Sequence, residues 1–242
     1  MNYIQYLEWD SKIFKKNIGK LNINSLNKKN IGKILDECKK INLSCLFCFV
    51  NINYNTINIA QENKFDLINI KVGYNLNLKK RNNKLNSIPR NIKLEDAKIS
   101  DIKKLIQINN YVGKTSRFYK DKKIKKNISR KIYREWIKNS LKGYADKIIV
   151  LKIKNEIYGF ISCKIKNKIG IIDLIGVLPE YQGKGYGKLL INESIKWFNS
   201  KNIDEIEVTT EGENISAQRL YQKIGFRIYD AKLVYHKWFT PN

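Results

Sequence analysis

Residues 177–198, VLPEYQGKGYGKLLINESIKWF, are the stretch from which we predict the fold of this chain. An apolar segment ends at Pro179, glycines then stand at every second position from Gly183 to Gly187, and an amphipathic run follows. This pattern predicts a strand, a turn and the start of a helix. Glycines let a ligand approach the backbone, and the first turn of a helix carries partial positive charge. The stretch is therefore typical of a site for phosphate or pyrophosphate.

Two common phosphate loops do not fit this stretch. The GxxxxGK[ST] loop is excluded because no lysine followed by Ser or Thr stands five residues after a glycine here. The GxGxxG loop is excluded because position 188 is lysine, and the surrounding strands do not form a βαβ unit. A glycine-rich turn that only caps a helix remains as the alternative interpretation.

The composition is that of a globular protein with a large positive charge. The chain has 242 residues, 43% of them hydrophobic, and a formal net charge of +25. Lys, Ile and Asn together make up 109 residues, which is typical of A/T-rich coding, and the lysines are scattered without an arginine cluster. We therefore interpret the charge as mainly compositional and expect no nucleic acid as a macromolecular partner. The charge would still attract a polyanionic small molecule.

The sequence predicts a cytoplasmic protein without a membrane span or a metal site. The opening MNYIQYLEWDSKIF mixes charged with apolar residues, unlike a signal peptide, and no run of 18 apolar residues occurs. His236 is the only histidine, which leaves a zinc site short of ligands. Cys45 and Cys48 form a CxxC in an apolar stretch, where strand alternation would place the two thiols on opposite faces. We interpret the cysteines as structural thiols.

A polar segment, KKRNNKLNSIPRN at residues 79–91, divides the chain. It predicts an N-terminal α/β domain at 1–80, a linker at 81–91 and a larger domain at 92–242. In the first domain we expect strands at 18–23, 43–50 and 68–78, with a helix marked by Ile31, Ile34, Leu35, Cys38 and Ile41.

The second domain is predicted to alternate helices with mainly antiparallel strands. Its expected elements are a strand at 92–97, helices from about 100 and over 122–142, strands at 147–154, 156–165 and 168–177, a helix at 186–199, a strand at 204–210, a helix at 214–225 and two closing strands at 226–229 and 232–238. The predicted class is mixed α/β, a largely antiparallel sheet flanked by helices, which is neither doubly wound nor all-β.

Two motifs of this domain resemble those of the GCN5-related N-acetyltransferases, the GNAT family. Residues 182–187, QGKGYG, match the family's Q/R-x-x-G-x-G/A signature. Residues 214–226, NISAQRLYQKIGF, are similar to its N-x-x-A-x-x-L-Y-x-x-x-G-F closing motif. The resemblance covers about residues 90–242. It implies a GNAT fold there, acetyl-coenzyme A as cosubstrate and an acyltransferase activity without metal.

The resemblance also implies which residues hold the cofactor. The loop amides would bind its pyrophosphate, and main-chain groups of the preceding strand would pair with pantetheine where that strand splays from its neighbour. Asn214 would reach the cofactor, although asparagine is also simply a good helix N-cap. The implied contacts are Ile175, Val177, Gln182, Gly183, Lys184, Gly185, Tyr186, Gly187, Lys188 and Asn214.

Tyr221 and Asp173 are the expected catalytic residues. The resemblance makes Tyr221 the general acid that protonates the departing thiolate, whereas its place on one helix face with Leu220 and Ile224 fits a core tyrosine. A general base must accept a proton from the attacking amine. We predict Asp173 in this role, with Glu211, Glu213 or an ordered water as alternatives, and its simpler interpretation is a polar residue on a half-exposed strand.

Stretches along the whole chain resemble one group within that family, the dTDP-4-amino-4,6-dideoxygalactose (dTDP-fucosamine) N-acetyltransferases. They are LEWDSKIFKKNIGKL (7–21), SRFYKDKKI (116–124), REWIKNS (134–140) and GFISCKI (159–165). In that group a truncated copy of the GNAT fold precedes the catalytic domain. The resemblance implies a nucleotide-linked amino sugar as acceptor, a role in surface-glycan synthesis, and a homodimer.

Arg117, Phe118 and Tyr119 are the predicted acceptor-binding residues. Arg117 would meet the diphosphate through its planar guanidinium, and Phe118 or Tyr119 would stack on a ring. A surface arginine beside two core aromatics is the competing interpretation. The acceptor could also be a protein N-terminus, a ribosomal protein or a polyamine, and few acidic residues near the motifs argue against the polyamine.

Overall fold

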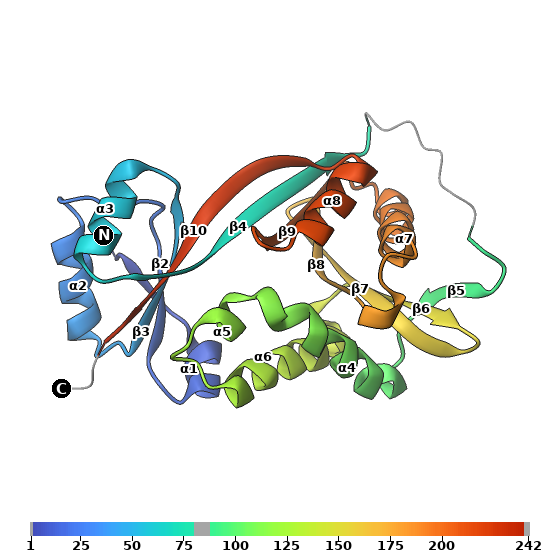
Figure 1. Ribbon diagram of the computed structural model, residues 1–242, viewed down its shortest axis with the longest axis horizontal. Helices are drawn as coiled ribbons and strands as arrows, with labels where there is room; N and C mark the ends of the chain where they lie inside the picture. The colour runs from blue at the N-terminus through green and yellow to red at the C-terminus, as the bar shows by residue number, and fades with distance from the viewer. Residues whose placement is uncertain (1, 80–87, 240–242) are drawn as a thin grey trace.

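The computed structural model describes residues 2–79 and 88–239. The strands in these ranges form one continuous sheet that runs along the long axis of the molecule (Figure 1). Ten strands follow the order β1-β2-β3-β10-β4-β9-β8-β7-β6-β5. Their bounds are β1 (Ile4–Tyr6), β2 (Ile18–Leu21), β3 (Cys45–Asn51), β4 (Asp66–Asn77), β5 (Ile92–Asp96), β6 (Lys147–Ile153), β7 (Glu156–Lys166), β8 (Ile169–Val177), β9 (Glu205–Glu211) and β10 (Arg227–Trp238). Only β2–β3 and β8–β9 pair in parallel among these strands, so the prediction of a largely antiparallel mixed sheet is confirmed.

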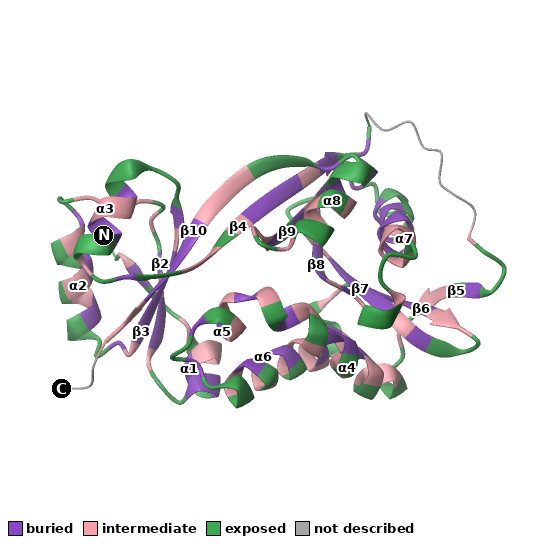
Figure 2. Ribbon diagram, viewed as in Figure 1, coloured by how far each residue is buried: buried purple, intermediate pink, exposed green. Residues whose placement is uncertain are grey.

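Helices cover both faces of this sheet. They are α1 (Glu8–Phe14), α2 (Ile31–Lys40), α3 (Tyr54–Glu62), α4 (Ile102–Val112), α5 (Arg117–Lys120), α6 (Lys126–Asn139), α7 (Tyr186–Ser200) and α8 (Ile215–Ile224). One face carries α2 and α3 at one end and α7 and α8 at the other, whereas α1, α4, α5 and α6 line the opposite face (Figure 1). Figure 2 shows buried residues along the strands and exposed residues on the outer sides of the helices. In the described ranges, no helix is both long and apolar enough to cross a bilayer.

Helix α6 connects the two ends of the molecule. Its Trp136 packs against two apolar clusters, one formed with β3 around Phe47 and one formed with β7 around Phe160. The predicted helix over 122–142 begins only at Lys126, and it continues into a π-helical turn, η3 (Ser140–Tyr144), inside which Gly143 has a φ of 101°. Because one helix packs into both clusters, it fixes the position of one end of the molecule relative to the other.

The last strand differs from its prediction. We expected two closing strands at 226–229 and 232–238, but the structure has the single strand β10. Register shifts against β4 between Ile228 and Asp230, and between Val234 and Tyr235, let the strand bend without ending. The bulges interrupt the apolar alternation of the strand. In the sequence this interruption looks like a turn between two strands.

Strand β10 pairs with β3 on one side and β4 on the other, and β4 pairs in turn with β9. The segments predicted as two domains, 1–80 and 92–242, are thus joined through the sheet. The predicted linker at 81–91 lies outside the described residues up to position 87. In β3, Cys45 and Cys48 pack in different apolar clusters on opposite faces, which confirms the alternation predicted for them.

A buried polar network fastens α5 to the end of β10. The Asp121 carboxylate accepts hydrogen bonds from Trp238 Nε1 at 2.8 Å and from the Lys123 amide at 2.8 Å, and it lies 2.6 Å from His236 Nδ1. Burial opposes ionisation of Asp121, but these hydrogen bonds outweigh it and lower its pKa. Burial lowers the pKa of His236 despite the carboxylate. The network therefore joins a carboxylate to a neutral imidazole at pH 7.

Replacing Asp121 with alanine is expected to lower the free energy of unfolding by about 2–4 kcal/mol, because His236 and Trp238 would keep buried N–H groups without an acceptor. Chemical denaturation at pH 7 measures this change. Asp66→Ala is the matched control, because Asp66 pairs with the neighbouring Lys123 at 2.6 Å in a largely exposed ion pair and should cost about 1 kcal/mol or less. Equal losses in the two variants would contradict a structural role for the buried network.

Candidate active site

Strands β8 and β9 separate partway along their length. They pair in parallel from Ile169 opposite Glu205 to Ile172 opposite Val208, and neither strand pairs with the other beyond this point. With α7 between them they form a βαβ unit, so the expectation that the strands around the glycines do not form one was wrong. Asp173 is the next residue of β8, and it stands at a bulge opposite Ser162 and Cys163 of β7. The bulge turns β8 away from β9. A splay of this kind is what the family resemblance implies, and it opens the sheet from Asp173 onward.

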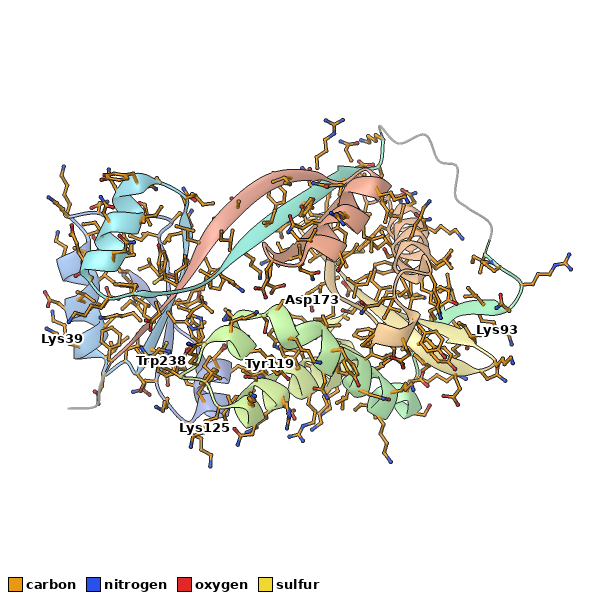
Figure 3. All side chains as sticks on the ribbon, viewed as in Figure 1. Lys39, Lys93, Tyr119, Lys125, Asp173 and Trp238 are labelled. Atoms are coloured by element: carbon orange, nitrogen blue, oxygen red, sulfur yellow. The ribbon has the colours of Figure 1, made fainter. Side chains whose placement is uncertain are left out.

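A pocket of about 570 Å³ lies at this opening. Its walls come from the separated ends of β8 and β9, from α8, from the α5–α6 side and from β3 and β4 of the first half. The lining includes Trp9, Phe49, Asn69, Lys71, Arg117, Phe118, Tyr133, Trp136, Asp173, Ile175, Glu211, Asn214 and Tyr221. Figure 3 shows Asp173 near the middle of the molecule, where the sheet faces the row of helices α4–α6. The structure therefore brings both predicted catalytic residues, Asp173 and Tyr221, to one pocket.

Two carboxylates face this pocket, one from the middle of β8 and one from the end of β9. Asp173 is open to the pocket space, yet the surrounding protein displaces enough water to raise its pKa, against the opposing charges of Lys164 and Lys71. Glu211 ends β9 on the other side of the splay. A raised pKa makes a carboxylate a stronger base, which suits it to accept a proton from an amine.

Tyr221 presents its ring to the pocket from α8. The residue is 2% exposed and packs against Tyr74, with ring centroids 5.6 Å apart, and against Phe226 at 5.8 Å. Burial, together with Glu211 and Tyr74, raises its pKa, so the phenol stays protonated. Its hydroxyl makes no hydrogen bond with any described residue, whereas the hydroxyl of Tyr74 donates to Gln218 Oε1 at 3.0 Å. Tyr221 therefore has the packing of a core tyrosine, and it also has a hydroxyl without a partner among the described residues, as a general acid requires.

The glycine loop lies between β8 and α7, outside the lining of the pocket. Gly183 and Gly185 have φ of 77° and 83°, and a Cβ at either position would meet no protein atom within 4 Å. At Gly187 a Cβ would come within 2.8 Å of Leu220, so this glycine serves the packing of α7 on α8. The loop thus uses glycine for two reasons, an open left-handed backbone and a close helix contact.

The loop also leaves a row of donors unused. None of the amide groups from Gly183 to Lys188 donates a backbone hydrogen bond to another described residue. The amide of Leu189 is the first that does, to Gly185 O at 3.2 Å. Consecutive free amides at the start of a 15-residue helix form a cradle for an anion, and Lys184 and Lys188 add positive charge to it.

Neighbouring residues hold the loop in place. The Gln182 side chain donates to Val177 O at 3.0 Å, and Lys184 Nζ lies 4.7 Å from the ring centroid of Tyr181. The rings of Tyr181 and Tyr186 stack with centroids 6.4 Å apart. At α8, Asn214 lines the pocket while its Oδ1 accepts from the Ala217 amide at 3.3 Å. Asn214 is thus an N-cap, and a cofactor contact through its remaining side-chain nitrogen stays a prediction.

The predicted acceptor residues of α5 differ in their placement. Arg117 lines the pocket, with Cζ 4.0 Å from the ring centroid of Phe118 and 4.6 Å from that of Phe47. Burial lowers the pKa of Arg117 to about 10. Phe118 also lines the pocket but is only 1% exposed, which leaves little ring surface for stacking. Tyr119 does not line it and packs edge-on against Tyr133 at 5.7 Å.

Several pocket residues were not anticipated from the sequence. Phe49, Asn69 and Lys71 come from strands of the first half, and Trp9 comes from α1. The alternation of Ile68, Ile70 and Val72 along β4 predicts one buried face, but Ile70 is 39% exposed and the opposite face, with Asn69 and Lys71, turns toward the pocket. Alternation in the sequence separates the two faces of a strand but does not distinguish a solvated face from one that lines a site.

Comparison with known proteins agrees with this geometry. Residues 115–226 match the model of the acetyltransferase (GNAT) family. The spore coat polysaccharide biosynthesis protein SpsD of Bacillus subtilis (strain 168) is 28% identical over 123 residues, which are 51% of this chain and 43% of SpsD. The ribosomal protein bS18-alanine N-acetyltransferase of Haemophilus influenzae is 33% identical over 104 residues, 42% of this chain and 70% of that enzyme.

A solved structure accounts for the arrangement of the whole chain. The tandem GNAT protein from the clavulanic acid biosynthesis pathway superposes with a TM-score of 0.62 at 12% identity, and the match covers 93% of this chain and 76% of that one. The fold is therefore a two-domain GNAT arrangement. The region matched to SpsD is less than half of that protein's length.

Proposed function

The chain belongs to the GNAT acetyltransferase family, and we propose that it transfers acetyl from acetyl-coenzyme A to the amine of a nucleotide-linked amino sugar. The pocket supports this acceptor because it carries charges of both signs. Asp173 and Glu211 stand where β8 and β9 have separated, at the place where an amine would react, and Arg117 stands on the α5 side. An acceptor with an amine at one end and a phosphate group at the other satisfies both charges. The match to SpsD, a polysaccharide biosynthesis protein by name, supports a role in surface-glycan synthesis.

The residues present fit coenzyme A. Gly183 and Gly185 leave open space at a left-handed backbone, and the amides from Gly183 to Lys188 have no backbone acceptor. We propose that this loop holds the pyrophosphate and that Ile175 and Val177 of the splayed strand hold the pantetheine arm. When bound, acetyl-coenzyme A supplies the thioester whose acetyl group is transferred.

Two side chains would handle the protons of this transfer. Asp173 accepts one proton from the acceptor ammonium, which leaves a neutral amine to attack the thioester carbonyl. A C–N bond forms and the C–S bond breaks. The departing sulfur takes the proton of the Tyr221 hydroxyl, and Tyr221 regains a proton from the nitrogen or from solvent. Atoms and charge balance without a covalent link to the protein, so no nucleophilic residue is required.

A protein N-terminus is the competing acceptor. It is favoured by the 33% identity to an enzyme that acetylates the alanine of ribosomal protein bS18. The amine of such an acceptor would suit the carboxylates, but the uncharged backbone that follows would offer the guanidinium of Arg117 only neutral carbonyl acceptors and no negative charge. Polyamines would place further positive charge beside that guanidinium. A cytoplasmic location and a homodimer remain predictions from the sequence.

Release of coenzyme A thiol from acetyl-coenzyme A tests the proposal. The protein would be assayed with dTDP-4-amino-4,6-dideoxygalactose, with a peptide that begins with alanine, and with spermidine. We expect release that depends on the sugar nucleotide and product that carries an N-acetyl group by mass. Release with the peptide or spermidine alone would overturn the acceptor and retain the reaction.

Asp173→Asn should lower kcat by about 100-fold, because the amine loses its proton acceptor. Since burial raises the pKa of Asp173, kcat of the unaltered protein should fall as the pH decreases through a value above the ordinary aspartate pKa of about 3.9. The asparagine variant should lack this decline. Glu211→Gln is the control, since it removes the other pocket carboxylate and should keep the pH profile. A profile that changes in Glu211→Gln instead would transfer the role to Glu211.

A further inference from the structure

We propose that Lys20, Lys71 and Arg117 form a subsite around the ring of Phe49 that binds the phosphate groups of the acceptor. The inference rests on the proposed function and adds to it the part of the molecule that recognises the acceptor. Three of these four residues belong to β2, β3 and β4, so the subsite would be built mainly by the first half of the chain.

Three cations converge on one aromatic ring. Lys20 Nζ lies 5.6 Å from the ring centroid of Phe49, Lys71 Nζ lies 5.9 Å from it, and Arg117 Cζ lies 5.2 Å from it. They come from three elements, β2, β4 and α5, which meet at the junction of the two halves. Phe49, Lys71 and Arg117 line the pocket directly.

These cations have no counterion within ion-pair distance among the described residues, although the carboxylate of Asp10 attracts Arg117, and those of Glu211 and Asp173 attract Lys71, from farther away. In the described part of the chain, none of the three forms an ion pair within 4.0 Å. Lys71 stands opposite Glu211 in the β4–β9 pairing without reaching it, whereas Lys232, its neighbour on β10, pairs with Asp230 at 3.7 Å. Nη1 of Arg117 is buried without a hydrogen-bond partner, and so is Oδ1 of Asn69 in the same pocket. A buried guanidinium nitrogen without an acceptor is costly unless a ligand supplies one.

Repulsion among the three cations indicates the charge of that ligand. Burial lowers the pKa of Lys71, and the positive charges of Arg117 and Lys20 lower it further, against the carboxylates of Glu211 and Asp173. A group with two negative charges would relieve this repulsion more fully than a single carboxylate, and an arginine offers two parallel donors to phosphate oxygens. The ligand chemistry that fits is a diphosphate.

The position of the subsite fits the proposed acceptor. Asp173 and Glu211 stand at the splay of β8 and β9, while the ring of Phe49 lies on β3, two strands beyond β4 in the sheet order. The amine and the phosphates of one molecule would thus be held by different halves of the protein. The glycine loop would remain available for the pyrophosphate of the cofactor.

Calorimetric titration of inorganic pyrophosphate into protein saturated with coenzyme A tests the subsite, because coenzyme A occupies the glycine loop. We expect pyrophosphate to bind more tightly than orthophosphate. Lys71→Met and Arg117→Met should each raise Kd by about tenfold or more, and Lys20→Met by several-fold. Lys237→Met is the matched control and should leave Kd unchanged, because Lys237 lies near the rings of Phe65 and Phe239 on the opposite face of the sheet. Thermal unfolding and coenzyme A binding check that each variant is folded.

Absence of pyrophosphate binding in the unaltered protein would overturn the subsite. Equal weakening by Lys237→Met would also overturn it, since the overall charge would then explain binding. The acceptor proposal fails separately: pyrophosphate binding with the expected variant pattern, without acetylation of the sugar nucleotide, would support the subsite and discard the acceptor. Acetylation with an unchanged KM in Lys71→Met would discard the subsite alone.

Discussion

Replacing Gly185 with valine is expected to raise the Kd for acetyl-coenzyme A by at least about 100-fold while the protein remains folded. Gly185 has φ of 83° at the N-cap of α7, where a residue with a Cβ pays about 1–2 kcal/mol of backbone strain. A Cβ at this position would meet no protein atom within 4 Å. The added side chain would therefore occupy the space in which the pyrophosphate must approach the amides from Gly183 to Lys188, and a tenfold change in Kd corresponds to only about 1.4 kcal/mol.

Gly143→Val separates strain from blocked binding. Gly143 has φ of 101° and equally open surroundings, but it lies in the turn after α6, away from the loop. Equilibrium binding of coenzyme A and thermal unfolding would be measured for both variants. We expect similar losses of stability, with loss of binding confined to Gly185→Val. If Gly185→Val binds coenzyme A normally, the pyrophosphate lies elsewhere.

Tyr221→Phe is expected to lower kcat by about 100-fold with little change in the Kd for coenzyme A. The phenol supplies the proton that the departing sulfur needs, and general acid catalysis is worth about 10²–10⁴-fold. Burial raises the pKa of Tyr221, so the donor remains protonated across the working pH range. The ring itself is kept in the variant, and with it the packing against Tyr74 and Phe226.

Tyr74→Phe is the control for this effect. It removes a hydroxyl from the ring next to Tyr221, one that bonds to Gln218 and does not line the pocket. Single-turnover measurements should show near-normal chemistry for Tyr74→Phe, with a loss of stability of about 1 kcal/mol from the broken hydrogen bond. Nearly normal kcat in Tyr221→Phe would assign this tyrosine to the core alone.

The features that follow from local chemistry were predictable. QGKGYG predicted a loop with an open backbone followed by the start of a helix. Left-handed glycines and the first helical turn are determined by residues that are close in sequence. Asn214 and Gly225 likewise mark the two ends of α8, as an N-cap and as a C-cap with φ of 109°. The largely antiparallel sheet followed from short turns between β6, β7 and β8.

Features that depend on distant pairing were not predictable. Nothing near Asp230 shows that the strand continues through a bulge, and nothing near Lys71 shows that its face of β4 is covered by α5. Phe49 lies at the candidate site only because β10 pairs with both β3 and β4, which places these two strands near each other in the sheet. The sequence could not decide between a stacking and a core role for Phe118 either, since its near-complete burial comes from Phe14, Phe47 and Trp136 rather than from its own neighbours in sequence.

The place of β10 between β3 and β4 also sets the order in which the protein can be completed during synthesis. Residues 2–79 contain both strands, but their facing edges have no partner until residues 227–238 have left the ribosome. Pairing over such a separation is slow, and an exposed strand edge invites association with other chains. The first half of the nascent chain therefore keeps two unpaired strand edges until β10 has been synthesised. A chain whose translation stops before residue 227 would be an aggregation-prone fragment rather than a folded domain.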